Sequence, residues 1–505
     1  MRWPIAIALI LAFVKLLLFL VAANGYGYFR DELYFLACTE HIAWGYPDHA
    51  PLSVFIAKFS RDLFGDSLYA IRFFPALSGA LKIILTALIV REFGGRWLAT
   101  LLACLCVLAA PFYLASDNLL SMNAYEPIFW MGCVLAYIWV VKREDPRYWL
   151  LFGAFAGLGV MNKHSAAFFC LSIVIGLVLT RDRTHFKSPY LWLGGLVAAI
   201  IFLPNLIWQY QNDWATLELL RNVQATGKNV VLSPIEFILQ QVLIMMPLTA
   251  PVWLAGIWYL LFDRDGKRFR ALGIAYVALL IIMIALKAKN YYLAPVYLML
   301  FAAGGVWWEA LFDRFRFGRV IGLAYAGLIV IAGAMLLPLA LPVLPVERFI
   351  VYQEEIGIKP PKTEVGHSGP LPQHFGDMFG WPEMVEKVAG VYHSLPPDER
   401  ERVAIYGSNY GEAGAIDHYG PAYGLPKAIS PHQSYFMWGP RNYDGSVMIL
   451  LGSEKSDAID RCDSVEERDA VGVPYAMGEE HFNILICRGL KTPLPVLWKD
   501  LKHWN

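Results

Sequence analysis

Hydrophobic positions in this chain gather into long, nearly uninterrupted runs, with no heptad seam and no internal repeat. A helix that crosses a membrane needs about 20 consecutive apolar residues. About eleven runs come close to this length, and they cover residues 4–23, 67–90, 97–116, 124–141, 148–162, 165–180, 190–208, 238–261, 271–287, 292–311 and 319–344. The pattern predicts a polytopic α-helical membrane protein with about eleven transmembrane helices. The first run is too long for the core of a signal peptide, so we expect it to be retained.

Beyond these runs the pattern becomes that of an ordinary water-soluble domain. RVAIYG, SVMILLG and FNILICRG are short apolar runs typical of strands. WPEMVEKVAGVYHSL has apolar residues at helical spacing and is followed by a Pro-Pro pair, which is typical of a helix and its end. We therefore predict a transmembrane domain over residues 1–344 and a soluble mixed α/β domain over residues 345–505.

Basic residues mark every second connection between the apolar runs, in REFGGR, KREDPR, RDRTHFK, DRDGKRFR and DRFRFGR. The opposite connections contain few Lys or Arg. Because cytoplasmic loops are enriched in these residues, Arg2 and the basic connections are predicted to be cytoplasmic. Residues 24–66, 209–237 and 345–505 then lie on the outer side, which makes the C-terminal domain extracytoplasmic.

Composition narrows the class further. Of the 505 residues, 57% are hydrophobic and only 17% are charged, whereas about a quarter are charged in soluble domains. The formal net charge is +0, so no overall basic field indicates a nucleic-acid partner. Cys462 and Cys487 are the only cysteines of the C-terminal domain, and an extracytoplasmic location would permit a disulfide between them, which the sequence leaves open.

The first outer connection, residues 24–66, carries many ionisable residues among aromatic ones. Its middle, RDELYFLACTEHIAWG, has the amphipathic character of a helix lying in the membrane interface. Asp31 and Glu32 are adjacent, so on a helix they point about 100° apart, and one can face a pocket while the other braces the fold. They also suit a plain acidic first turn. A carboxylate crowded by apolar groups holds its proton more tightly and suits a general base.

Two further acidic positions are candidates. Asp48 and His49 stand between prolines in YPDHAP, a rigid turn that fixes the direction of side chains. This turn is either a plain loop or the place where a second carboxylate faces the first, to bind a cation or orient a substrate. Glu126, followed by Pro127, opens a helix near the outer face, and an intramembrane carboxylate is a functional candidate.

Cationic residues gather at the predicted outer ends as well. Arg72 starts the second apolar run and would either extend to the interface or hold a phosphate. Lys163, Lys287 and Lys289 lie on the side that is normally poor in lysine, which an anionic ligand would explain. The basic groups suit a lipid-borne phosphate. The carboxylates suit deprotonation of an acceptor hydroxyl, or a metal bridging to that phosphate.

The order of these segments resembles a known family. It is similar to the bacterial relatives of the protein O-mannosyltransferases and the lipid A aminoarabinose transferases, which are GT-C glycosyltransferases that use polyprenyl-phosphate sugars. The similar segments cover nearly the whole chain: Asp31-Glu32, GYPDHAPL, Tyr69-x-x-Arg72 with PALSG, DNLLSMNAYEPIFW, GLGVMNKHS, PNLIWQ and KNYYLAPVY. The resemblance implies a GT-C-type fold in the inner membrane of a bacterium, with a cytoplasmic N-terminus and a periplasmic C-terminal domain.

The resemblance also implies an activity, namely sugar transfer from a polyprenyl-phosphate-linked donor to an acceptor at the outer face, with inversion and with Asp31 as the base. The resemblance implies that Asp31, Glu32 and Asp48 are catalytic and that Arg72 holds the donor phosphate, with a weaker match at Glu126. The other candidates come from their positions: Lys163, Lys287 and Lys289 for the phosphate, and His49, Glu126, Asn290 and Tyr292 for the substrate. No cofactor is implied with certainty, and a divalent cation at Asp48 stays open. Tyr34 stands where the aminoarabinose transferases have arginine, so lipid A is not implied as the acceptor. A glycan, another lipid or a protein stays open.

Two other classes of protein compete with a transferase. A transporter or flippase of lipid-linked substrates would explain many spans and intramembrane charges, but it predicts sites at the midplane of two related halves. A non-catalytic membrane scaffold would use the C-terminal domain to bind a partner. Its candidate surface is SNYGEAGAIDHYG, with Glu412, Asp417 and His418, a stretch that is also typical of a strand-to-helix junction.

Overall fold

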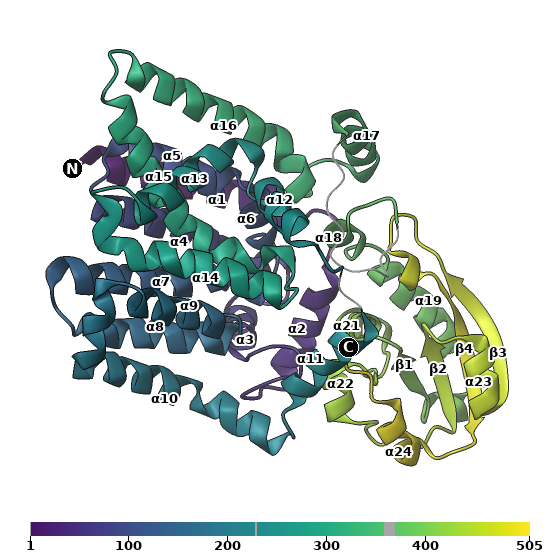
Figure 1. Cartoon of the computed structure of the whole chain (residues 1–505). Helices are drawn as coiled ribbons and strands as arrows, with labels where there is room; N and C mark the ends of the chain where they lie inside the picture. The colour runs from purple at the N-terminus through teal and green to yellow at the C-terminus, as the bar shows by residue number, and fades with distance from the viewer. Residues whose placement is uncertain (1, 228–229, 358–368) are drawn as a thin grey trace.

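The computed structural model describes residues 2–227, 230–357 and 369–505. Most of the chain forms a body of long helices, and a smaller α/β part lies at one end of it (Figure 1). The α-helices of the larger body are α1 (Arg2–Ala22), α2 (Arg30–Glu40), α3 (Leu52–Phe64), α4 (Leu68–Glu92), α5 (Trp97–Ala109), α6 (Pro111–Ser116), α7 (Met122–Arg143), α8 (Tyr148–Asn162), α9 (Ala166–Val178), α10 (Pro189–Gln211), α11 (Ala215–Thr226), α12 (Pro234–Ile244), α13 (Ala250–Leu261), α14 (Arg270–Ala285), α15 (Tyr297–Phe312), α16 (Gly318–Ala340) and α17 (Val346–Ile356). Short 3₁₀ segments connect some of them: η1 (Arg181–Lys187), η2 (Pro247–Thr249), η3 (Gly266–Phe269) and η4 (Asn290–Val296).

The predicted polytopic helical fold is confirmed, because every apolar run of the sequence is helical. Within the described ranges, 7 helices are long and apolar enough to cross a membrane, or 8 if a bent pair counts as one span. Three further apolar helices, α5, α8 and α9, are shorter. The expected number of about eleven spans is therefore not established by length and composition.

The run 238–261 was expected to be one continuous span, and this expectation is wrong. Helices α12 and α13 meet at an angle of 93°. The reason lies in Met246 and Pro247, because proline lacks a donor and disfavours helical backbone in the residue before it. Met246 has a φ of 72°. The Thr249 hydroxyl donates to the carbonyls of Met245 and Met246, at 2.6 and 2.9 Å, and so satisfies groups that the break leaves open.

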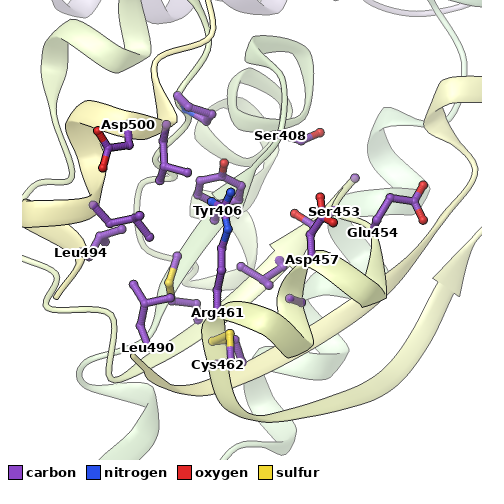
Figure 2. A pocket seen from close by; sticks show the side chains of 18 of the residues that line it. Tyr406, Ser408, Ser453, Glu454, Asp457, Arg461, Cys462, Leu490, Leu494 and Asp500 are labelled. Carbon is purple, nitrogen blue, oxygen red and sulfur yellow. A yellow bond between two sulfur atoms is a disulfide. The ribbon is translucent and has the colours of Figure 1, made fainter. Parts of the chain in front are cut away.

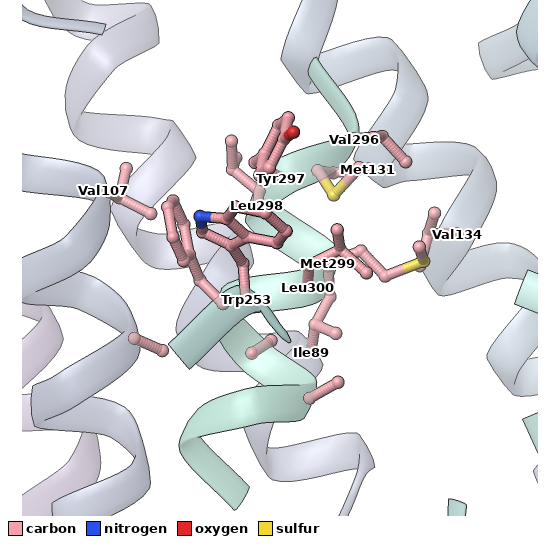
Figure 3. Packing of buried hydrophobic residues seen from close by; sticks show 14 of the residues in the cluster. Ile89, Val107, Met131, Val134, Trp253, Val296, Tyr297, Leu298, Met299 and Leu300 are labelled. Atoms are coloured by element: carbon pink, nitrogen blue, oxygen red, sulfur yellow. The ribbon is translucent and has the colours of Figure 1, made fainter. Parts of the chain in front are cut away.

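The core of the helical body is formed by large side chains from α5, α7, α13 and α15 (Figure 3). Trp253 packs edge-on against Tyr297, with ring centroids 5.5 Å apart. Gly304 of α15 lies so close to α13 that an added Cβ would be 1.8 Å from the Val252 carbonyl oxygen. Small residues at such contacts allow membrane helices to pack backbone against backbone.

The α/β part is built on a four-stranded sheet with the order β1-β2-β4-β3. Its strands are β1 (Ala404–Gly407), β2 (Val447–Leu451), β3 (Cys462–Val471) and β4 (Phe482–Leu490). β1 and β2 are parallel, and the other two pairings are antiparallel. One face packs on α19 (Trp381–Ser394) and α21 (Tyr410–Tyr419), and the other on α23 (Lys455–Arg461) and α24 (Leu494–Leu497). The remaining short elements are α18 (Gln373–Gly376), α20 (Pro397–Arg400), η5 (Gly420–Tyr423), α22 (Gln433–Trp438), η6 (Gly478–Glu480) and η7 (Trp498–Leu501).

The three predicted strands and the predicted helix are confirmed as β1, β2, β4 and α19. In β1 and β2, Ile405 and Ile449 face α19 and α21, whereas Ala404 and Met448 face α23. The sequence did not predict β3, CDSVEERDAV, because its residues are mostly charged and exposed. Charged side chains are typical of an edge strand, where they oppose pairing with another chain.

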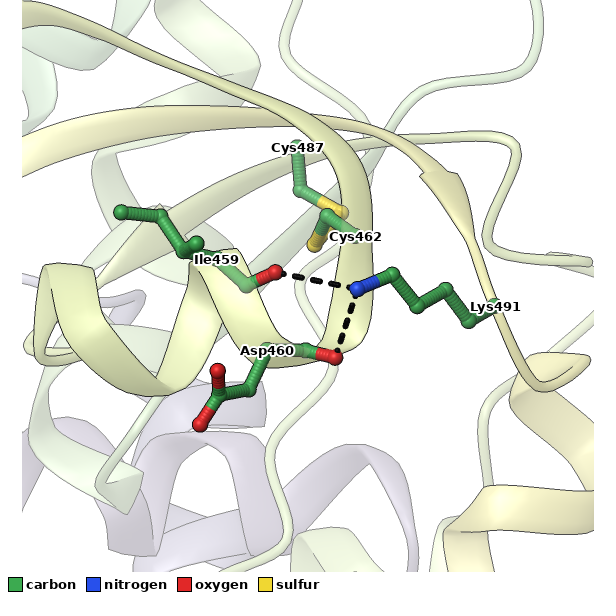
Figure 4. Close-up of a disulfide and its surroundings, with 5 residues drawn as sticks. All are labelled: Ile459, Asp460, Cys462, Cys487 and Lys491. Atoms are coloured by element: carbon green, nitrogen blue, oxygen red, sulfur yellow. Dashed lines mark hydrogen bonds between the residues drawn. A yellow bond between two sulfur atoms is a disulfide. The ribbon is translucent and has the colours of Figure 1, made fainter.

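The pairing of Cys462 and Cys487, which the sequence left open, is present as a disulfide between β3 and β4 (Figure 4). Beside it, the Lys491 ammonium donates to the carbonyls of Ile459 and Asp460 at 3.2 and 2.9 Å, and so caps the end of α23. The disulfide joins residues that are 25 positions apart. In the chain-entropy account, a cross-link of this kind stabilises the folded chain by about 3 kcal/mol. The edge strand is thus fastened to the sheet.

A cavity of about 430 Å³ opens at the carboxyl ends of β1 and β2 (Figure 2). Ser408 and Arg461 are among its polar lining residues. His503 also lines the cavity, and its ring stacks on that of His432 with centroids 4.8 Å apart. The ring of His432 in turn lies 4.8 Å from that of Tyr410. The wall of this cavity is therefore connected, ring by ring, to the first turn of α21.

Candidate active site

The predicted catalytic stretch folds into α2, as expected for a helix. The Glu32 carboxylate accepts a hydrogen bond from the backbone N–H of Phe29, 2.9 Å away, which caps the start of α2. Nine of its eleven residues are buried, because α21 packs against it. Gly414 of α21 permits this contact, since an added Cβ would lie 3.0 Å from the carbonyl carbon of Leu33. The predicted helix is thus present, and the C-terminal part covers it through α21.

Glu32 and Arg72 form a fully buried ion pair between α2 and α4. Arg72 Nε and Nη2 donate to the two carboxylate oxygens at 2.8 and 2.6 Å. The same guanidinium donates to the carbonyls of Ala23 and Gly27, at 2.6 and 2.8 Å. Glu32 also accepts from the Leu120 N–H at 2.9 Å. Both side chains are 0% exposed, so Arg72 holds the starts of these helices together, where the sequence had suggested a contact with a donor phosphate.

Asp31 has a different set of neighbours. It accepts a hydrogen bond from the Tyr410 hydroxyl at 2.7 Å. The Tyr410 ring stacks on that of Tyr34, with centroids 4.6 Å apart. The Tyr34 hydroxyl donates to Asp48 Oδ1 at 2.9 Å and lies 2.6 Å from Ser434 Oγ. Two carboxylates from separate segments are thus joined by two stacked phenols, one from each part of the chain.

Burial raises the pKa of Asp48 and the pKa values of the two tyrosines that join it to Asp31. It raises the pKa of the Asp48 carboxyl above its ordinary value, and the charge of Asp31 adds to the rise. Burial and the charge of Asp48 hold the pKa of the Tyr34 phenol well above its ordinary value. Burial and Asp31 have the same effect on the pKa of Tyr410. Both phenols therefore remain neutral donors at physiological pH.

His49 forms one side of this group. It is buried, its ring stacks on that of Phe35 with centroids 4.7 Å apart, and its Nε2 lies 3.9 Å from Asp48 Oδ1. Its Nδ1 lies 3.1 Å from the carbonyl oxygen of Ala50. The turn YPDHAP therefore fixes both side chains, as its prolines predicted.

A second group of predicted residues lies at the N-terminal end of α7. Lys163 Nζ lies 3.1 Å from Glu126 Oε2 and donates to Asn123 Oδ1 at 2.8 Å. The ammonium also stands 4.3 Å from the centre of the Tyr292 ring. The Ser165 hydroxyl donates to the other oxygen of Glu126. The side chains of Lys163, Glu126 and Tyr292, predicted from three separate segments, thus meet in one place.

Asn205 of α10 connects the two groups. Its amide donates to the carbonyl oxygen of Trp44 at 2.8 Å, just before the turn that carries Asp48. Its side-chain oxygen lies 3.2 Å from Nε2 of His164, which follows Lys163. Asn205 thus links the segment that precedes Asp48 to the residue that follows Lys163.

The remaining predicted residues lie at the start of η4. The Asn290 amide donates to Gln240 Oε1 at 2.5 Å, and the Asn290 carbonyl accepts from Gln241 at 2.8 Å. Lys289 precedes the first residue of η4. Lys287 is exposed and has a φ of 51°. Asn290 thus fastens η4 to α12, which is a structural contact, and Lys287 presents a cation at the surface.

A metal centre is not formed by the residues that the structure describes, among which no three His, Cys, Asp or Glu side chains converge as metal ligands do. Among the described residues, Asp48 contacts the Tyr34 hydroxyl and the His49 ring.

Sequence reasoning missed the tyrosines and the serine that join the aspartates. Tyr410 and Ser434 belong to the C-terminal part, and no local signal connects them with residue 31 or 48. It also missed a buried cluster in which Asp117 pairs with Lys15 at 3.0 Å and with Lys82. The lysines stand alone in apolar runs, and an intramembrane ionisable residue is a signal that could have found them.

The candidate scaffold surface is not a surface. Glu412 and Asp417 are buried, and Asp417 accepts from the Ala428 N–H and the Tyr435 hydroxyl at 2.8 and 2.9 Å. The stretch is the junction between β1 and α21, which was the alternative interpretation.

Comparisons with known proteins match this architecture. Residues 48–208, roughly a third of the chain, match the sequence model of the family described as dolichyl-phosphate-mannose-protein mannosyltransferase. No curated protein matches the chain. Of the solved structures, ArnT from Cupriavidus metallidurans bound to undecaprenyl phosphate is similar with a TM-score of 0.60 and 14% identity, over 96% of this chain and 97% of that one. The same protein in the apo state gives 0.58 and 13%, over the same shares.

A second relative comes from an archaeon. The oligosaccharyltransferase AglB from Archaeoglobus fulgidus, in complex with an inhibitory peptide and a dolichol-phosphate, is similar with a TM-score of 0.54 and 15% identity, over 85% of this chain and 64% of that one. At such identities the likeness shows the fold. The fold that the resemblance implies is thereby confirmed: this chain is a multi-pass membrane protein with the fold of ArnT and AglB.

Proposed function

We propose that this protein transfers a sugar from a polyprenyl-phosphate-linked donor to an acceptor at the outer face of a bacterial inner membrane, with Asp31 as the base. The observation that carries the proposal is the difference between two neighbouring carboxylates. Glu32 is saturated by Arg72 and backbone groups, whereas Asp31 is partly exposed and accepts a single hydrogen bond among the described residues. Asp31 is thus held in place while one of its oxygens stays available.

The reaction is a single displacement at the anomeric carbon. An acceptor hydroxyl gives its proton to Asp31 as its oxygen forms a bond to that carbon. The bond between the carbon and the phosphate oxygen breaks, and its electron pair leaves with the polyprenyl phosphate. Attack on the face opposite the leaving group inverts the anomeric centre. Asp48, through Tyr34 and Tyr410, fixes the orientation of Asp31.

The leaving phosphate gains negative charge, so cations must stand near it. Lys163 is the strongest candidate, because it is buried beside Glu126 at the connection between the two groups. Lys287 and Lys289 are further candidates at the start of η4. Arg72 is not proposed for this role, since its guanidinium is enclosed by Glu32 and backbone carbonyls. His49 and Tyr292 are placed to line the space for the sugar.

An apolar groove of about 390 Å³ supports a prenyl donor. Its lining includes Phe55 and Phe59 of α3, Leu77 of α4, and Ile128 and Phe129 of α7. The helices α3 and α7 begin beside Asp48 and Glu126, so the groove leads away from the site along these two helices. An isoprenoid chain suits such a surface because it is apolar along its whole length.

The proposed orientation places the N-terminus in the cytoplasm and the C-terminal part in the periplasm. The disulfide between Cys462 and Cys487 supports it, because disulfides persist in oxidising compartments. We also propose that residues 1–344 supply the carboxylates and the lipid groove, and that residues 345–505 close the site through Tyr410 and Ser434.

Transport of a lipid-linked substrate is the second candidate, and the buried cluster of Asp117, Lys15 and Lys82 is the observation that favours it. Charges inside a helical bundle are typical of transport pathways. Here, however, both lysines are paired with the single aspartate, and Lys15 also donates to the Tyr113 carbonyl at 2.9 Å. This arrangement fits a structural contact equally well.

The test is an incubation of the purified full chain in liposomes with radiolabelled polyprenyl-phosphate sugars and a membrane extract, with and without a chelator. We expect label to move from the lipid to a new species. Label that crosses the bilayer while still attached to its carrier would instead identify a transporter and overturn the proposal. Loss of transfer with the chelator, restored by a divalent cation, would identify a metal requirement.

A further inference from the structure

A basic cavity lies at the end of the helical body opposite the proposed site. It has a volume of about 630 Å³ and is bounded by the end of α7, by η1 and by η3. Helix α7 begins beside Glu126 and ends beside this cavity. At 1.5 Å per residue, its 22 residues span about 33 Å, which is about the thickness of the hydrocarbon core of a bilayer. The two sites therefore belong to opposite leaflets.

The lining of the cavity is strongly unbalanced in charge. It contains five cationic side chains, which are Arg181, Arg183, Lys267, Arg268 and Arg270. None of the five has a carboxylate within ion-pair distance among the residues that the structure describes. The single acidic residue of the lining, Asp182, accepts a hydrogen bond from the Tyr137 hydroxyl at 2.6 Å.

The other basic connections on this side show that the imbalance is local. Arg96 lies 3.6 Å from Glu309 and also pairs with Asp313. Lys142 lies 3.0 Å from Glu92. Arg96 and Lys142 thus stand beside carboxylates of the chain, which the five cations of the cavity do not among the described residues.

Two loops distant in sequence bring the five cations together. Two of them are held in place by backbone carbonyls: Arg268 donates to Val141 at 3.2 Å, and Arg270 donates to Leu261 at 2.9 Å. Arg181, Arg183 and Lys267 are exposed at the rim. Like charges brought together repel one another, so this arrangement is stabilised when an anion enters.

We propose that this cavity binds the phosphate of an anionic phospholipid headgroup in the cytoplasmic leaflet. A planar guanidinium can donate two parallel hydrogen bonds to two phosphate oxygens. Because the lining has few carboxylates, the arginines of this cavity can make these bonds to a ligand. Val141 and Leu179 line the same cavity and offer an apolar surface to the glycerol and acyl portion. Basic pockets between membrane helices on this side are suited to such headgroups. The binding does not depend on the proposed transfer reaction.

The test is native mass spectrometry of the full chain, purified in detergent and titrated with phosphatidylglycerol, phosphatidylcholine or inorganic phosphate. We expect phosphatidylglycerol to bind at least tenfold more tightly than phosphatidylcholine. Arg181→Ala/Arg183→Ala should weaken it by about 20- to 30-fold, because each arginine near an anionic headgroup contributes roughly fivefold. Inorganic phosphate that displaces phosphatidylglycerol at millimolar concentration would assign the site to soluble phosphate instead.

The matched control is Arg314→Ala/Arg316→Ala, which removes two exposed arginines from another basic connection. It should leave the affinity for phosphatidylglycerol unchanged. Equal loss in both variants would mean that the lipid responds to the charge of the whole face, and the proposal would be overturned. Equal binding of phosphatidylglycerol and phosphatidylcholine by the unaltered chain would overturn it without any variant.

Discussion

Two carboxylates that are neighbours in sequence lie in opposite environments. Glu32 faces Arg72 inside the protein, and both side chains are 0% exposed. The guanidinium donates one hydrogen bond to each carboxylate oxygen. Asp31 faces neutral phenols at the contact between the two parts of the chain. We call the first the Glu32–Arg72 clamp and the second the tyrosine bridge, which joins Asp31 to Asp48 through Tyr410 and Tyr34.

The difference teaches which carboxylate is available for chemistry. A guanidinium in bidentate contact compensates the charge of a carboxylate and occupies its lone pairs, so the carboxylate has little left to offer a substrate. A phenol donates one hydrogen bond and brings no charge. Among the described residues, Asp31 therefore accepts one hydrogen bond and has one oxygen left to accept a proton, as a general base must.

The largest expected effect comes from breaking the tyrosine bridge at its reactive end. Asp31→Asn keeps the size of the side chain but removes its ability to accept a proton. Since general base catalysis contributes about 10²- to 10⁴-fold, we expect transfer of radiolabelled sugar to fall by that factor. The midpoint of thermal unfolding should stay within a few degrees of the original.

The control is Asp62→Asn, an exposed carboxylate of α3 that pairs with Lys58. It should transfer sugar at the original rate. If folded Asp31→Asn protein transferred sugar at an undiminished rate, Asp31 would not be the base. The difference between Asp31 and Glu32 would then have no role in catalysis.

Breaking the clamp should mainly reduce stability. Arg72→Ala leaves Glu32 buried without its cation, and loss of one partner of a buried pair costs about 3–5 kcal/mol. We expect a markedly lower midpoint of unfolding in detergent, measured by differential scanning fluorimetry. Glu32→Gln/Arg72→Gln should recover part of the loss, because no charge is then left unpaired.

Arg91→Ala, in the same helix but 56% exposed, is the matched control and should be nearly neutral. An Arg72→Ala protein of unchanged stability whose apparent KM for the lipid donor rises would show that Arg72 binds phosphate after all. The assignment of Arg72 to the clamp would then be wrong.

A smaller effect is expected at the phenol itself. Tyr410→Phe removes the hydrogen bond to Asp31 and keeps the stacked ring. A hydrogen bond to a charged group is worth about 1.5–3 kcal/mol, so we expect kcat/KM to fall by about tenfold. The acidic limb of the pH–rate profile should move to higher pH. Tyr423→Phe, on an exposed residue of the same part, should leave both unchanged, and an unmoved profile in Tyr410→Phe would count against the bridge.

The sequence was informative wherever a signal was local. Apolar runs marked the helices, and the acidic pair after the first run marked the site. The prolines of YPDHAP predicted a fixed turn. The hydropathy of residues 238–261 does not predict the break at Met246, although Pro247 is a local signal for it.

The partners of each charge were not predictable, because they depend on contacts between distant segments. Whether Glu32 or Asp31 would receive Arg72 depends on the packing of α4 against α2, about which a single sequence says nothing. Tyr410 reaches Asp31 only because the C-terminal part folds back over α2. Location alone suggests phosphate ligands at the ends of the apolar runs. It does not reveal that Arg72 is enclosed by Glu32 and backbone carbonyls.

A third carboxylate environment extends the comparison. Glu412 and Glu480 are buried together in the C-terminal part, where Asn409 donates to both of them at 2.9 and 3.4 Å. Among the described residues, neither carboxylate forms an ion pair. Burial therefore raises the pKa of Glu412 to about 7, and burial together with Glu412 holds the pKa of Glu480 well above its ordinary value.

The smallest expected effect on sugar transfer follows from this pair, because the predicted change is one of stability. The folded chain holds the proton of Glu412 more tightly than the unfolded chain does, so it binds more protons between pH 4.5 and about 7. Stability should therefore fall as the pH rises through this interval, by roughly 3 kcal/mol. In Glu412→Gln the fall should be largely absent, as measured by unfolding midpoints from pH 5 to pH 8. Glu383→Gln, an exposed position of α19, should keep the slope of the original chain, and an equally steep fall in Glu412→Gln would show that other groups cause it.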